Sequence, residues 1–190
     1  MNIFILDTNP ITAARMHCDK HVPKMCVEAA QMMASALRRH GATDEDMPLT
    51  KAGKPYKGGY AHHPCTVWAG ESWANFEWLA NHAITLCIEY TARFGKTHAC
   101  EQPIVQMNTL HMKQFKQDKL TPFALAMPDE YRPKHSTPTM PIDKDKYIVS
   151  HAVGSDAVKA YQAYYHSKQF AKWEKGTPAP DWWRGVEVMA

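Results

Sequence analysis

Residues 22–39 read VPKMCVEAAQMMASALRR, and this stretch decides the fold. Pro23 stands where a first-turn proline belongs, and no other proline or glycine follows before Gly41. Apolar side chains recur in it at helical spacing, at Cys26, Ala30, Met33 and Leu37. The pattern predicts a long helix that buries one face and leaves a neighbouring polar stripe, with Lys24 and Glu28, in solvent.

The rest of the chain repeats the helical period in shorter pieces. A long helical region is expected from Pro64 to Phe94, which a bend near Asn81 and His82 could divide into two helices. Shorter helices are expected over 11–16, 103–115 and 155–172, the last capped by Ser155 or Asp156. Residues 3–6 form a short apolar run that fits either a strand or an arm packed on the core.

Two segments lack this period. Residues 120–147 hold five prolines and are expected to be mostly irregular, and residues 173–190 form an aromatic tail. No internal repeat and no clean linker interrupts the chain. The sequence therefore predicts an all-α fold, with a single compact helical domain over residues 1–190.

Composition sets the class of protein but not its function. The chain has 190 residues, 45% of them hydrophobic and 22% charged, which excludes a disordered or collagenous chain. It has no run of 18 apolar residues and no basic start followed by an apolar stretch, so we expect a cytoplasmic protein without a membrane partner. The formal net charge of +3 permits a nucleic-acid partner without requiring one.

The five cysteines form no CxxC pair. An odd, scattered set indicates reduced thiols, and neither a disulfide framework nor a cysteine-rich zinc site is expected. We accordingly predict no cofactor and no metal.

The densest cluster of reactive side chains lies at residues 17–24, which read HCDKHVPK. His17 and His21 have the spacing with which two imidazoles share a metal on a helix. Lys20 and Lys24 would repel a cation, however, and suit a phosphate beside the helix start. A solvated basic corner is the simpler interpretation.

A second cluster, GGYAHHPCTVW, spans residues 58–68. Its glycines permit close backbone approach, and His62 or His63 is placed to cap the next helix. Tyr60 and Trp68 could stack on a base, although Trp68 fits a core position equally well.

Two further groups mix polar and aromatic side chains. Positions at helical spacing from 68 to 93 carry Asn75, His82, Glu89 and Arg93, which indicates either a core edge or a polar pocket. The tail holds Trp173, Trp182 and Trp183, which either stack on nucleic acid or pack over the core.

Taken in order, these segments resemble the pyrimidine-dimer DNA glycosylases of phages and bacteria. In that family a basic segment opens the first long helix, as DKHVPKMCVEAAQ does at 19–31. A glycine–aromatic turn follows, then His-Pro and a tryptophan four residues later, as at Gly59, Tyr60, His63, Pro64 and Trp68. A later leucine–glutamate–arginine–glycine pattern matches LCIEYTARFG at 86–95, so that the resemblance covers about residues 1–100.

The resemblance implies an all-α fold, double-stranded DNA as the partner of a monomer, and attack by a free N-terminal amine on the sugar. An α-amine has a lower pKa than a lysine side chain, so more of it is nucleophilic near neutral pH. Asn2 is too large for ready removal of Met1, so the nucleophile would be the amine of Met1. His21 is expected at the position of the family's glutamate, and Glu28, Asp7 and Glu89 are the further candidates for the acid–base group.

The resemblance also assigns DNA contacts. Lys20, Lys24, Arg93 and Lys96 would bind phosphates. A flipped base and its surroundings would be contacted by Tyr60, His62, His63, Trp68, Asn75, Trp182 and Trp183. Lyase activity would follow from a Schiff base between the amine and the sugar.

Three other functions stay open at the level of sequence. One is a DNA-base-modifying transferase that uses a pocket of His62 and His63 with Glu89 and Arg93. Another is a metal-dependent hydrolase that uses His17 and His21. The last is a nucleic-acid-binding module without chemistry, which would show salt-dependent binding alone.

Overall fold

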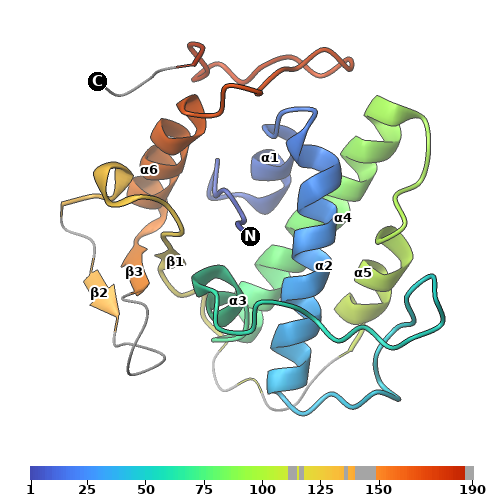
Figure 1. The fold of residues 1–190 in the computed structure, drawn as a ribbon. Coiled ribbons are helices and arrows are strands. Elements are labelled where there is room, and N and C mark those ends of the chain that lie inside the picture. Colours follow the sequence, from blue (N-terminus) through green and yellow to red (C-terminus); the bar gives the residue numbers. More distant parts are fainter. Residues whose placement is uncertain (111–114, 116–117, 135–136, 140–148, 187–190) are drawn as a thin grey trace.

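The computed structural model describes residues 1–110, 115, 118–134, 137–139 and 149–186 (Figure 1). Its helices are α1 (Pro10–Arg15), α2 (His21–Arg39), α3 (Pro64–Ala69), α4 (Trp73–Phe94), α5 (Glu101–Asn108) and α6 (Gly154–His166). Short strands are β1 (Phe123–Ala124), β2 (Thr137–Thr139) and β3 (Val149–Ala152), with a 3₁₀ turn at Asp129–Tyr131. The prediction of a mainly helical fold is confirmed. None of the helices in the described ranges is long and apolar enough to cross a membrane.

Helix α2 is the centre of the bundle, as its sequence predicts. It packs against α3, α4 and α5, while α1 lies on α4 (Figure 1). Its apolar positions Cys26, Ala30, Met33 and Leu37 are all buried. The stripe with Glu28 is not fully solvated, because Glu28 itself is only 9% exposed.

The helical region after Pro64 breaks earlier than expected. The break lies at residues 70–72, so the predicted bend near Asn81 and His82 is wrong. Gly70 ends α3, and Ser72 starts α4 because its side chain accepts a hydrogen bond from the Asn75 backbone N–H at 3.0 Å. Helix α4 then runs unbroken to Gly95, which takes a left-handed conformation with φ 68°.

The N-terminal residues form the arm rather than a strand. Ile3, Phe4, Ile5 and Leu6 are all buried in the core. Asn2 fixes the start of this arm, since its Oδ1 accepts from the backbone N–H groups of Ile3 and Phe4, while its Nδ2 donates to the Ala126 carbonyl at 2.6 Å. The chain start is therefore held in place in the middle of the molecule.

A small antiparallel sheet is the part of the fold that the sequence does not reveal. Its order is β1-β3-β2, with Phe123 paired to Ala152 and Thr137 paired to His151. The hydroxyl of Tyr161 joins the sheet to α6, because it donates to the Ala124 carbonyl at 2.7 Å. Parts of the proline-rich segment, 135–136 and 140–147, lie outside the described residues.

Two helix boundaries differ from prediction. Helix α5 ends at Asn108, before the expected Phe115, and α6 ends at His166 rather than Lys172. Val153 occupies the cap position of α6 without a side-chain hydrogen bond, so the expected capping by Ser155 or Asp156 is wrong. Beyond His166 the chain continues as an irregular tail that extends past the connection between α1 and α2 and then returns to the end of α6 (Figure 1).

Candidate active site

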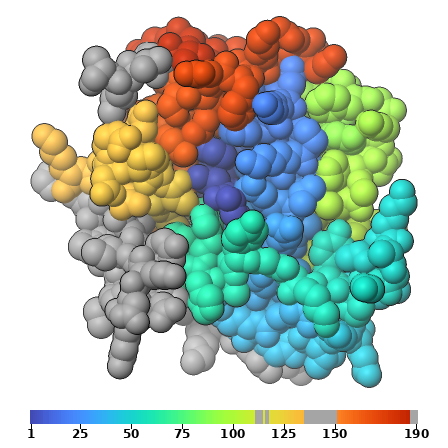
Figure 2. All heavy atoms as spheres, in the orientation of Figure 1, coloured from blue at the N-terminus to red at the C-terminus, as the bar shows by residue number. Residues whose placement is uncertain are grey.

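A cavity of about 200 Å³ surrounds the start of the chain. Its lining combines the N-terminal arm, one face of α2 and the end of α6: Met1, Asn2, Phe4, His21, Lys24, Glu28, Tyr164, Lys168 and Phe170. Figure 2 shows the N-terminal residues, in dark blue, at the centre of one face, bordered by α6, α2 and the residues around α3. Segments from both ends of the sequence thus meet at one site.

Glu28 and the amine of Met1 lie together in this cavity. The Oε2 atom of Glu28 is 3.9 Å from the Met1 nitrogen and accepts a 2.7 Å hydrogen bond from the Asn2 backbone N–H. Its Oε1 atom is 3.4 Å from Nζ of Lys24. A buried carboxylate is therefore held between two amines, which is the arrangement that acid–base assistance to an amine nucleophile requires.

The face of α2 that lines the cavity includes His21, the residue expected in place of the family's glutamate. Positions 21, 24 and 28 share one face of a helix, so His21, Lys24 and Glu28 all reach the cavity. Glu28 is the member of this face that meets the amine. The spacing of seven residues between His21 and Glu28 was the available signal.

His21 forms a neutral wall of the cavity. Its Nδ1 is 2.7 Å from the Tyr165 hydroxyl, and its ring stacks on Phe4 with centroids 4.7 Å apart. Burial, together with nearby His17 and Lys24, lowers the pKa of His21 to about 2. His21 is thus uncharged near neutral pH, which does not favour the acid–base role that the sequence suggested for it.

Lys168 lines the cavity, although the sequence did not predict it as a site residue. Its Nζ lies 3.4 Å from the ring centroid of Tyr164 and 5.7 Å from that of Phe4. Burial, and then the charge of Lys24, lower the pKa of Lys168 to about 8. No sequence motif predicts that Lys168 belongs to the site. Lys168 follows α6, and only the tertiary fold brings it to the cavity.

The edge of α3 closes the other side of the chain start. Thr66 donates from its hydroxyl to Sδ of Met1 at 3.3 Å. Burial and the Met1 amine lower the pKa of His63 to about 4, so His63 is a neutral imidazole beside that amine. Its Nδ1 accepts from the Cys65 N–H at 3.2 Å, which confirms that a histidine caps this helix.

Tyr60 and His62 extend from the loop before α3. Tyr60 is 69% exposed and has a positive φ of 52°, and both residues line a second cavity of about 270 Å³. Gly58 lies just before them and packs closely against Ser35 of α2. A Cβ added to Gly58 would come within 2.3 Å of the Ser35 hydroxyl. The glycine thus anchors this loop to α2.

Glu89 and Arg93 form a buried structural network away from this site. Nε and Nη2 of Arg93 donate to Glu89 at 3.0 and 2.9 Å, and Nη1 donates to the His17 carbonyl at 2.7 Å. The Arg93 side chain is fully buried, so the expected phosphate contact is not available to it in this structure. The two residues satisfy each other, so this end of the stripe is a core edge and not a polar pocket.

The pocket proposed for a transferase is not formed. His63 lies at α3, which meets the first turn of α4 through the hydrogen bond from Asn75 to the Trp68 carbonyl. Glu89 lies 14 residues further along α4, which is about 21 Å at the rise of an α-helix.

Trp68 and Asn75 are also interior residues. Trp68 is 1% exposed and packs against Trp78 and Phe123, while Asn75 donates to Thr121 at 2.7 Å. Burial removes both from contact with DNA in this structure, which corrects their assignment. Lys96, in contrast, is exposed just after α4.

The aromatic tail packs over the core. Trp183 stacks on His166 with centroids 4.9 Å apart, and Trp182 donates from Nε1 to Sδ of Met16 at 3.3 Å. Both rings remain half-buried. The two tryptophans therefore have a packing role.

Asp7 has a local structural role, because its Oδ1 accepts a hydrogen bond from the Asn9 N–H at 2.7 Å.

Among the residues that the structure describes, the histidine pair of the hydrolase alternative has no third ligand close enough to share an ion. Nδ1 of His17 forms a 2.9 Å hydrogen bond with the Ala13 carbonyl. The ring centroids of His17 and His21 are 6.0 Å apart. Within the described ranges, the one group of three potential metal ligands close enough to share an ion contains neither residue. The geometry does not favour a metal-dependent hydrolase at this position.

Comparison with known proteins identifies the family. The family model described as pyrimidine dimer DNA glycosylase matches residues 1–102, more than half of the chain and a range that contains Met1 and Glu28. No curated protein and no solved structure matches the chain. The chain belongs to the pyrimidine dimer DNA glycosylase family.

Proposed function

We propose that this protein is a DNA glycosylase with lyase activity that acts on a damaged or modified pyrimidine in duplex DNA. The observation that carries the proposal is the 3.9 Å approach of Glu28 Oε2 to the Met1 nitrogen, two residues that both lie in the range matched by the family model. An amine and a carboxylate at this distance are the two groups that the reaction needs.

In the first step the uncharged amine of Met1 attacks C1′ of the target nucleotide. The new N–C1′ bond forms as the bond from C1′ to the base breaks, and the departing base takes the bonding electrons and a proton from water. Positive charge develops on the sugar, and the carboxylate of Glu28 lies where it stabilises that charge. Glu28 then accepts the proton that the amine releases.

The second step cleaves the strand. Opening of the sugar ring gives an imine between Met1 and C1′, and the ring oxygen takes up a proton. The imine acidifies the neighbouring C2′–H, so that loss of that proton expels the 3′-phosphate as the leaving group. An amine nucleophile performs both steps without a metal or an organic cofactor.

The surroundings of the cavity suit a nucleic acid. Lys20 and Lys24 begin α2, and Lys168 faces the same cavity, so three cations can contact the phosphates that flank the target. Tyr60 and His62 present exposed rings next to the chain start, where a separated base can stack. We propose that these residues, rather than Trp68 or Arg93, hold the DNA.

The test uses a duplex oligonucleotide with one pyrimidine dimer, incubated with the protein and borohydride. We expect a covalent adduct by intact mass, peptide mapping that locates it on residue 1, and no adduct with undamaged duplex. A DNA product of changed mass, without base release or adduct, would favour the transferase instead. Binding without any chemistry would contradict the proposal.

A further inference from the structure

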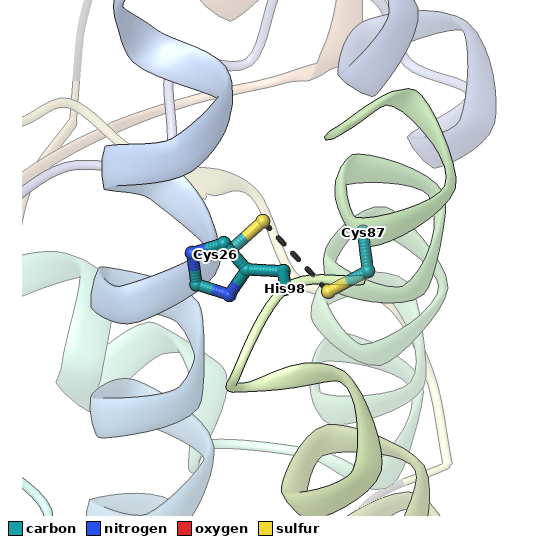
Figure 3. A group of neighbouring side chains, drawn as sticks. All are labelled: Cys26, Cys87 and His98. Carbon is teal, nitrogen blue, oxygen red and sulfur yellow. Dashed lines mark hydrogen bonds between the residues drawn. The ribbon is translucent and has the colours of Figure 1, made fainter. Parts of the chain in front are cut away.

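Three side chains with soft or borderline ligand atoms meet where α2, α4 and the loop before α5 pack together. Cys26 comes from α2, Cys87 from α4 and His98 from the loop, and one ligand atom of each lies within 4.8 Å of the others. Figure 3 shows the two sulfur atoms directed toward each other, with the imidazole beside Cys26. The glycosylase site described above uses none of these residues.

The sulfur separation fits a shared ion. Sγ of Cys87 lies 3.7 Å from Sγ of Cys26. Two thiolates on one tetrahedral zinc ion, each with a Zn–S bond of about 2.3 Å, lie about 3.8 Å apart. The helices therefore already hold the thiols at the distance that zinc requires.

The imidazole is oriented as a metal ligand is. Nδ1 of His98 accepts a hydrogen bond from the Cys100 N–H at 3.1 Å, so Nδ1 is the unprotonated nitrogen, whose lone pair a metal would take in place of that N–H. The ring also forms a hydrogen bond with the backbone of Pro23, which has no N–H, so the ring is the donor there. Metal-bound histidines commonly donate their second nitrogen to a backbone carbonyl, which fixes the tautomer.

We propose that Cys26, Cys87 and His98 bind one zinc ion through two thiolates and Nδ1. Binding releases two protons to solvent, one from each thiol, while the neutral imidazole gives up its hydrogen bond from Cys100. Both cysteines are buried and His98 is partly exposed, and a water molecule on the side of His98 would complete tetrahedral coordination.

The site would fasten together the elements that position the active residues. Cys26 lies two positions before Glu28 on α2, and Cys87 lies on the helix against which α2 packs. Zinc at this point crosslinks α2, α4 and the loop before α5 without touching the cavity at the chain start. Its role is structural, and it does not depend on the proposed glycosylase activity.

Metal content is the first measurement. Protein purified under reducing conditions without chelator is expected to hold about one zinc per chain, by elemental analysis with copper and iron measured in the same sample. Cys26→Ser, Cys87→Ser and His98→Gln are each expected to reduce the zinc content severalfold. Cys18→Ser is the matched control, since Cys18 is also buried but lies outside the group, and it should keep its zinc.

A spectroscopic measurement covers variants that fold poorly. Cobalt added to the metal-free, folded wild-type chain should produce thiolate-to-cobalt charge-transfer absorption, and zinc should abolish it and raise the melting temperature. Zinc below about a tenth of an equivalent, together with no cobalt absorption, would overturn the proposal. A Cys26–Cys87 disulfide that persists under these reducing conditions would overturn it as well. Loss of glycosylase activity alone would not bear on it.

Discussion

Glu28 accepts a 2.7 Å hydrogen bond from the backbone N–H of Asn2, and the same Oε2 atom lies 3.9 Å from the Met1 amine. One carboxylate oxygen thereby fixes the path of the chain start and faces the amine that we propose as the nucleophile. The structural role of this side chain coincides with its proposed chemical role. The activity of a Glu28 variant therefore has to be interpreted together with a measurement of its folding stability.

Glu28→Gln is the direct test of the carboxylate. The amide keeps the shape but cannot take the amine proton or stabilise a cationic sugar, so we expect single-turnover cleavage to fall by about 100-fold or more. DNA affinity should be unchanged or stronger, because a negative charge is lost. Glu77→Gln, at an exposed position of α4, is the control and should cleave at the wild-type rate. Equal rates for both variants would remove Glu28 from the mechanism.

Blocking the amine tests the nucleophile separately. A variant that carries two or three extra residues before Met1 places its α-amine outside the cavity and turns the Met1 nitrogen into an amide. We expect no borohydride adduct and at least about a 100-fold loss of cleavage, because an amide is not a nucleophile near neutral pH. The same residues added after Ala190 are the control. Full activity of the N-terminally extended chain would require another nucleophile.

Lys168 should make DNA binding sensitive to pH. With its pKa near 8, Lys168 is charged below that pH and loses its charge above it, while DNA phosphates stay charged. We expect the dissociation constant at fixed salt to rise severalfold from about pH 7 to about pH 9. Lys168→Met should flatten this dependence, whereas Lys159→Met, on the exposed side of α6, should not.

The same lowered pKa has a consequence for stability. An unfolded lysine titrates near 10.4, so between about pH 8 and 10.4 the unfolded chain binds more protons at this position. The contribution of Lys168 to folding stability therefore increases with pH in that window. Urea denaturation of the wild type and of Lys168→Met at both ends of the window measures it, and a wild-type advantage that shrinks with pH would contradict the sign.

Arg93 should matter for stability rather than for DNA binding. Arg93→Met leaves Glu89 and Asp19 without their buried partner, and we expect a loss of about 3–5 kcal/mol in the free energy of unfolding. Lys96→Met, close by but exposed, should change that free energy by less than about 0.5 kcal/mol. Urea titrations of both variants decide the matter. A folded Arg93→Met chain of normal stability but weakened DNA binding would restore the phosphate contact.

Tyr60 should contribute stacking energy only when DNA is bound. Tyr60→Ala removes an exposed ring, so we expect an unchanged melting temperature and an approximately 10-fold weaker affinity for dimer-containing duplex. Tyr60→Phe keeps the ring and should bind as the wild type does. Equal affinities of the alanine and phenylalanine variants would show that the ring does not meet the DNA.

The sequence by itself determined the helical class and its central element. An uninterrupted run from Pro23 to Gly41 with apolar residues at helical spacing can bury its apolar face only as a helix, and α2 forms there. The family resemblance could likewise be recognised from the sequence alone, and the family model matches residues 1–102. Both are local signals, because spacing along one chain segment sets them.

The tertiary structure decided which distant residues meet. Packing of the N-terminal arm against α2 brings Glu28 to Met1, whereas the sequence left Glu28, Asp7 and Glu89 as equal candidates. Packing of α2 against α4 brings Cys26 to Cys87, which are 61 positions apart and form no motif. The same packing buries Trp68, Asn75 and Arg93, whose residue types alone had suggested a DNA surface. Helical spacing identifies a shared face, but the partner of that face depends on how the segments pack, and hydrophobic burial over the whole chain sets that packing.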